Sequence, residues 1–160
     1  MERQRALGLA LASSPEYDSE RARELLLFAL STDPNDALVI LRLGDISPGE
    51  EDRELCYRRA LELDPDWASA RANLANYLVG QGREKEAWDF TAGHAHENLE
   101  MMGVHGRVLL GLGHFEEAAS ILEQAVHLNV SDDSFLYQDL WLALVHSGNY
   151  RAALKIARKG

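Results

Sequence analysis

The stretch GLGHFEEAASILEQAV, residues 111–126, places two glycines directly before apolar residues in helical spacing. Glycines ahead of a helix can begin a phosphate-binding loop, or they can only turn the chain between two helices. A phosphate loop would follow a buried strand and carry further glycines or a Lys-Ser/Thr pair, and this stretch has neither. We therefore interpret the two glycines as a turn between helices.

The same arrangement occurs elsewhere in the chain. A glycine stands five residues before an alanine in three places, Gly82 to Ala87, Gly113 to Ala118 and Gly148 to Ala153. Glycine adopts the left-handed backbone conformation at little cost and therefore commonly ends a helix. We predict that a helix ends at each of these three glycines.

Other residues indicate where helices begin. Asp33-Pro34 and Asp64-Pro65 each offer an N-capping aspartate followed by a proline that suits the first helical position. Ser47 and Glu50 have the spacing of a capping box. We therefore predict a helix start at each of these sites.

Apolar residues between these sites follow the helical period. They recur at three- and four-residue spacing, as Leu25, Phe28 and Ala29 do, and no segment keeps the two-residue period of a strand for long. The sequence therefore predicts an all-α chain of helical hairpins.

These residues resemble the tetratricopeptide repeat family, whose repeat is a hairpin of two helices. The resemblance is best over residues 68–131, where the matching residues are Leu74, Ala75, Gly82, Ala87, Gly106, Gly113, Phe115, Ala118, Leu122 and Ala125. It implies an all-α superhelix, or solenoid, of about five hairpins that form one domain over residues 1–160. The approximate repeats are residues 3–36, 37–67, 68–98, 99–132 and 133–160.

The resemblance also implies a function. In the family, the first helices of successive repeats line a concave groove that holds a peptide or a partner helix. The groove positions of this chain are Arg42, Asp45, Asn73, Asn76, Arg107, Gln138 and Asp139. We expect a non-catalytic scaffold or adaptor in which the asparagines pair with the backbone of a protein segment and the arginines with a carboxylate. A sensor for a short signalling peptide, or a concave face without ligand preference, would use the same positions.

A carboxylate clamp of the kind found in chaperone-binding members is not predicted. Apolar or small residues occupy the positions where its lysines could stand, namely Leu7, Leu41, Ala72 and Gly103.

A metal-dependent or cryptic enzyme is the alternative from another class. His96 and Glu100 are four residues apart and could share a helix face, and His94 or His105 could complete a zinc site. Solvated loop histidines are the simpler interpretation, and His105 falls in a core position where we expect a half-buried, hydrogen-bonded side chain. Since no phosphate-loop, nucleophile-elbow or zinc-protease motif is present, we predict no catalytic residue, metal or cofactor.

Composition narrows the partners and the location. The chain has 16 Lys and Arg against 26 Asp and Glu, a net charge of −10, which disfavours nucleic acid as a partner. Cys56 is the single cysteine, which fits a reducing compartment, and we predict a cytoplasmic protein. The apolar run over residues 6–12 is a weak signal-peptide candidate, and no stretch is long enough to cross a membrane.

The last predicted hairpin suggests self-association. An apolar face formed by Leu140, Leu144, Leu154 and Ile156 is expected to be only partly covered, because no polar capping helix follows it. We therefore expect the C-terminal repeat to pair with another copy or a partner.

Overall fold

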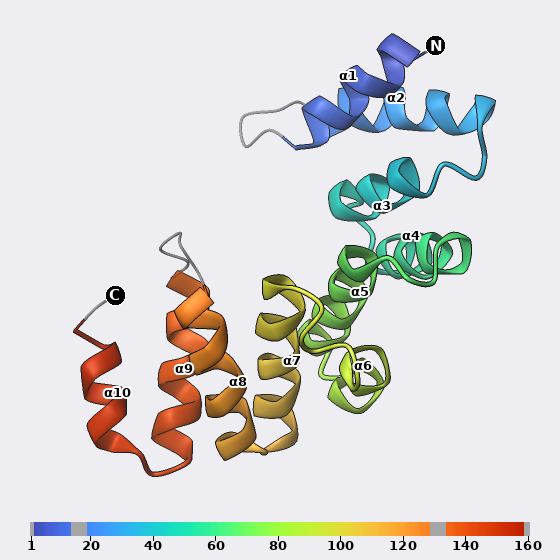
Figure 1. The fold of residues 1–160 in the computed structure, drawn as a ribbon. Coiled ribbons are helices and arrows are strands. Elements are labelled where there is room, and N and C mark those ends of the chain that lie inside the picture. The colour runs from blue at the N-terminus through green and yellow to red at the C-terminus, as the bar shows by residue number, and fades with distance from the viewer. Residues whose placement is uncertain (1, 14–18, 129–133, 159–160) are drawn as a thin grey trace. The chain divides into compact units, whose positions relative to one another are not determined.

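The computed structural model describes residues 2–13, 19–128 and 134–158. Ten helices, α1 to α10, and no strand occur in these residues, so the prediction of an all-α chain of helical hairpins is confirmed (Figure 1). The chain divides into two compact units, Met1–Ala70 and Arg71–Gly160, and each is described by itself. The division into one domain with five repeat boundaries stays a prediction.

The first unit contains α1 (Glu2–Ala12), α2 (Ser19–Thr32), α3 (Ala37–Ile46) and α4 (Glu50–Leu63). Its core holds the buried side chains Leu26, Ala29, Val39 and Leu43. Gly8 lets α1 approach α2, because a Cβ at this position would lie 3.1 Å from side-chain atoms of α2. The apolar run that resembled a weak signal peptide thus forms α1 and packs on α2.

The second unit contains most of α5 (Ala68–Gly80), then α6 (Glu84–Thr91), α7 (Leu99–Leu112), α8 (Phe115–Leu128), α9 (Ser134–His146) and α10 (Tyr150–Ile156). Each helix from α7 onward contacts the next, and Figure 1 shows these four helices side by side with alternating chain directions. Their shared core includes Met102, Leu109, Leu122, Leu140 and Leu144. Successive hairpins therefore bury one continuous apolar layer within this unit.

The glycine turns are confirmed. Gly82, Gly113 and Gly148 have φ values of +70°, +81° and +78°, and Gly113 is the C-cap of α7. A second kind of glycine serves close packing: a Cβ on Gly106 would lie 2.5 Å from the side chain of Leu122, so α7 and α8 touch at this point. The stretch that opens with Gly111 therefore turns the chain and is part of a helical hairpin.

The predicted helix starts at Asp-Pro are wrong. Helix α3 begins at Ala37, and its N-cap is Asp36, whose carboxylate accepts a hydrogen bond from the Val39 amide at 3.2 Å. Asp64 is the C-cap of α4, with φ −139° and ψ 88°. A residue before proline is pushed out of the α region, so each Asp-Pro ends the preceding helix and forms the following turn.

The predicted capping box is also wrong. The Ser47 hydroxyl donates to the Leu43 carbonyl at 2.7 Å, so this serine closes the end of α3. The N-cap of α4 is Gly49, which makes no side-chain capping bond. Three acidic residues in the first turn of α4 are placed favourably for the helix dipole instead.

The apolar face of the last hairpin was expected to be only partly covered, and the structure shows which of its residues are exposed. Leu140 and Leu144 are buried, because α8 and α10 both contact α9. Leu154 is 63% exposed, and Ile156 packs against the core at its edge. Of the four residues of the predicted face, Leu154 on α10 is therefore the exposed one.

Candidate functional site

A groove of about 370 Å³ lies over α5, α7 and α9 in the second unit. Asn73 and Asn76 face it from α5, three residues apart. Glu100, Gly103 and Arg107 face it from α7 at spacings of three and four residues, which places them on one side of that helix. The helical period thus assembles a polar rim from residues that are distant in the sequence.

The floor of the groove is apolar. Leu99, Val104 and Leu136 line it, and Phe135, a residue that is 71% exposed, lines the groove beside them. Gly103 keeps this floor open, because a Cβ there would already lie 3.0 Å from the Leu136 side chain. The groove therefore combines an apolar base with a few polar side chains, an arrangement typical of ligand sites.

Arg107 ties together the three helices that form the groove. Its guanidinium donates a hydrogen bond to Asn76 Oδ1 on α5. Its Nε lies 3.1 Å from Asp139 Oδ2 on α9, an ion pair in which the N–H does not point along a hydrogen-bond direction. Because arginine only donates, the Asn76 amide must turn its oxygen toward Arg107 and keep its NH₂ as the outward donor.

The structure brings some of the predicted groove residues together. Asn73, Asn76 and Arg107 line the same groove, and Asp139 is joined to it through Arg107. Gln138 is exposed on α9 and is not among the described residues that line the groove. These are positions only, and a binding role for them stays a prediction.

The other two predicted residues belong to the first unit. Arg42 and Asp45 form an ion pair of 2.9 Å along α3. Asp45 also accepts a hydrogen bond from the Tyr57 hydroxyl at 3.0 Å. Burial, with a further contribution from the Asp45 charge, raises the pKa of Tyr57, so the phenol stays protonated and donates to Asp45.

Sequence reasoning missed Phe135 and the role of Glu100. Glu100 was considered only as a metal ligand, although its spacing from Gly103 and Arg107 places all three on one helix face. Phe135 carries no polar group to attract notice, and its exposure follows from how α9 is rotated against α7. Only the position of Glu100 in the groove could have been found from the spacing.

The segment between α6 and α7 is held by an ionic cluster. Arg71, only 6% exposed, places Nη1 2.8 Å from Glu97 Oε2, and His94 Nδ1 lies 2.6 Å from Glu97 Oε1. The hydrogen bond from His94, followed by the charge of Arg71, holds the pKa of Glu97 below its usual range. This cluster fixes the chain just before α7 begins.

The histidines considered as a zinc site do not converge. His96 lies in the turn before α7, whereas Glu100 lies inside α7, so they do not share a helix face. His105 is half-buried, its Nδ1 is 2.9 Å from the Thr91 hydroxyl, and burial lowers its pKa. No group of three or more His, Cys, Asp or Glu side chains in the described parts of the chain is arranged to hold a metal.

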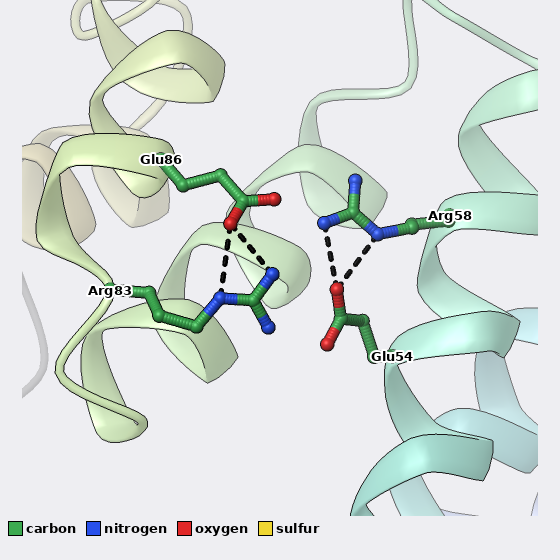
Figure 2. A network of polar contacts seen from close by, with 4 residues as sticks. All are labelled: Glu54, Arg58, Arg83 and Glu86. Carbon is green, nitrogen blue, oxygen red and sulfur yellow. Dashed lines mark hydrogen bonds and ion pairs between the residues drawn. The ribbon is translucent and has the colours of Figure 1, made fainter.

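Two further arginine–glutamate pairs are local. Figure 2 shows Arg58 of α4, whose Nε and Nη2 both contact Glu54 Oε1, at 2.8 and 2.7 Å. It also shows Arg83, whose Nε and Nη2 contact Glu86 Oε2 at 3.0 and 2.6 Å near the start of α6. Partly exposed pairs this close in sequence each contribute less than about 1 kcal/mol, so we interpret them as helix-supporting pairs.

Comparison with known structures shows the same fold. MamA AMB-1 superposes with a TM-score of 0.77 over 98% of this chain and 94% of that chain, at 21% identity. MamA 41-end from Desulfovibrio magneticus RS-1 superposes with a TM-score of 0.78 over 99% and 91%, at 15% identity. MamA MSR-1 gives a TM-score of 0.74 at 20% identity, with 99% and 92% covered. At these identities the likeness concerns the fold.

Sequence comparison gives a repeat family and a curated relative. The tetratricopeptide repeat model matches residues 99–129, which span α7 and α8. The peroxisomal targeting signal receptor of Candida glabrata is 37% identical over 106 residues, which is 64% of this chain. The aligned part is 17% of that receptor, so the chain spans under one fifth of the curated relative it matches.

Three observations thus agree on a fold of helical hairpins. The described helices form hairpins with glycine turns, a repeat model matches one of these hairpins, and solved structures share the fold. None of the described helices has both the length and the apolar character needed to cross a membrane. The chain is thus similar to the tetratricopeptide repeat family, whose model matches the hairpin of α7 and α8.

Proposed function

We propose that the chain is a non-catalytic scaffold or adaptor that binds an extended protein segment in the groove over α5, α7 and α9. Tetratricopeptide repeats are protein-interaction scaffolds, which supports the general class. The observation that carries the proposal is that Asn73, Asn76 and Arg107, chosen from sequence as groove residues, line one groove with an apolar floor. Its volume of about 370 Å³ lies within the usual range of ligand pockets.

The polar groups of this groove suit a peptide backbone. Arg107 fixes the orientation of the Asn76 amide, whose NH₂ can then donate to a backbone carbonyl of the segment. Asn73, one helical turn earlier on α5, provides a second amide along the same line. Amides that bind backbone groups recognise an extended chain whatever its side chains are.

The curated relative supports a peptide ligand. Its name describes a receptor for a targeting signal. Because the chain spans 17% of that receptor, we transfer only the class of ligand and not the signal itself. The predicted contacts of Arg42 and Asp45 would form a separate polar surface on the first unit, and those of Gln138 and Asp139 would extend the groove along α9. We propose a cytoplasmic location, with no nucleic-acid or membrane partner.

Capture of partners from the source cell tests the proposal. The bait proteins are the wild type, the double variant Asn73→Ala/Asn76→Ala, and Gln124→Ala, which removes an exposed amide from α8 outside the groove. We expect a protein that the wild type and Gln124→Ala retain and the double variant loses. Identical retention by all three baits would rule out the groove as the binding site, provided that circular dichroism shows all three folded.

We also propose self-association through the C-terminal hairpin. Trp141, Tyr150 and Leu154 are 42%, 65% and 63% exposed on α9 and α10, and together they present apolar surface to solvent. Sedimentation equilibrium of the wild type and of Tyr150→Glu/Leu154→Glu should show a dimer that the double variant loses. If the wild type is still a monomer at a concentration on the order of 100 micromolar, where even a weak specific dimer would form, this proposal is wrong.

A further inference from the structure

The charged side chains of the groove do not balance. Glu100 and Arg107 line it, and Asp139 is ion-paired with Arg107. The positive charge of Arg107 is thus already offset by Asp139. Glu100 is exposed in the first turn of α7, and the described part of the chain supplies no ion-pair partner for it. The groove therefore carries one unbalanced negative charge.

The unbalanced negative charge of the groove disfavours binding of an acidic ligand. A carboxylate entering the groove would share the Arg107 guanidinium with Asp139 and would also face Glu100, both of which repel it. A net charge of −10 on the whole chain adds a long-range field of the same sign. A lysine or arginine in the same place would instead pair with Glu100.

The exposed aromatic side chain favours the same kind of ligand. Phe135 lines the groove together with Glu100 and presents most of its ring to solvent. A phenyl face attracts a cation and also packs against the aliphatic stem of lysine or arginine. The apolar floor at Leu99, Val104 and Leu136 gives a neighbouring aliphatic side chain a place to pack.

We infer that the groove selects an extended segment in which a lysine or arginine stands next to aliphatic residues, and that it rejects acidic segments and free C-terminal carboxylates. This inference rests on the proposed function, since it specifies the ligand of the same groove. Glu100 and Phe135 select the basic side chain, and the asparagines hold the backbone without regard to sequence.

A random peptide library tests this preference. Random heptapeptides are synthesised on beads in two forms, one with an amidated C-terminus and one with a free C-terminal carboxylate. The labelled proteins are the wild type, Glu100→Lys, Asn73→Ala/Asn76→Ala, and Glu123→Lys as a control with the same charge change on α8. Circular dichroism establishes that each variant is folded before selection.

The expected result separates charge selection from backbone binding. The wild type and Glu123→Lys should enrich lysine and arginine beside aliphatic residues, with amidated peptides preferred over free acids. Glu100→Lys should lose this enrichment and bind the selected peptides about threefold to tenfold more weakly in fluorescence polarisation. The double asparagine variant should weaken all selected peptides.

Two different failures can be told apart. If binding requires the asparagines but the selected peptides are acidic, prefer a free carboxylate, or stay basic for Glu100→Lys, the charge inference is overturned and the proposed function stands. If no peptides are enriched, or if the asparagine variant selects the same peptides as the wild type, the groove does not bind peptides and both proposals fall.

Discussion

Replacing Gly106 by alanine tests the contact between α7 and α8 that defines the hairpin. A Cβ at this position would lie 2.5 Å from Cγ and Cδ2 of Leu122, which is fully buried. Because the Leu122 Cγ is itself too close, rotation of a terminal methyl group cannot relieve the overlap, so either the whole Leu122 side chain must move within the core or the helices must separate. Overpacking of this kind costs about 1–3 kcal/mol. Alanine regains about 0.8–1 kcal/mol of helix propensity over glycine.

The net expectation is a loss of up to about 2 kcal/mol in the free energy of unfolding. At about 2–4 °C per kcal/mol for a chain of this size, the melting temperature should fall by up to roughly 8 °C. Gly80→Ala is the control, because nothing lies within 4 Å of a Cβ at that position on α5. Calorimetry or thermal circular dichroism should show this variant unchanged or slightly stabilised.

A Gly106→Ala protein that melts above the wild-type temperature, as Gly80→Ala is expected to, would refute the reasoning. It would mean that α7 and α8 have room for a methyl group between them. The tight hairpin would then not depend on glycine at this position.

Three further predictions concern stability. Ala118→Leu places a large side chain at a fully buried position of α8, and urea unfolding should show a loss of about 1–3 kcal/mol; an unchanged midpoint would contradict the packing. Asp36→Ala removes both the N-cap of α3 and the partner of Arg5, and chemical denaturation should show a loss of about 1–2 kcal/mol, whereas Asp33→Ala should cost much less. Burial lowers the pKa of His105, so its neutral form stabilises the fold and this stability should decline as pH falls below about 6.5. Melting temperatures of wild type and His105→Asn between pH 7.5 and 5 should converge toward acid pH, and parallel curves would show that His105 does not titrate with unfolding.

The turns show what local sequence can and cannot predict. Gly113 was predicted correctly because positive φ is a property of the single residue, and glycine tolerates it best. Asp33-Pro34 was assigned to the wrong side of a turn. An aspartate before proline can be the N-cap of a helix that begins, or it can follow directly after a helix that ends. The N-cap of α3 is Asp36, whose carboxylate accepts a hydrogen bond from the Val39 amide and also pairs with Arg5 on α1. That second contact is tertiary and leaves no trace in the local sequence.

The groove was predictable to a similar extent. Asn73, Asn76 and Arg107 followed from repeat positions, because each repeat presents equivalent residues at equivalent places. The contact of Arg107 with Asp139 depends on the side-chain conformations of two helices and could not be read from spacing. The exposure of Phe135 depends likewise on how α9 packs against its neighbours.

Helix α7 contains three glycines, Gly103, Gly106 and Gly111, in 14 residues. Each costs about 0.8–1 kcal/mol of helix propensity relative to alanine, so the segment alone would be a poor helix. All three glycines instead permit contact with neighbours, Gly103 with Leu136, Gly106 with Leu122 and Gly111 with Glu84. The helical state of α7 is therefore conditional on α8 and α9 being in place. Unfolding of either neighbour should melt the polar rim carried by Glu100 and Arg107, which makes the groove a cooperative property of three helices, formed or lost in one step.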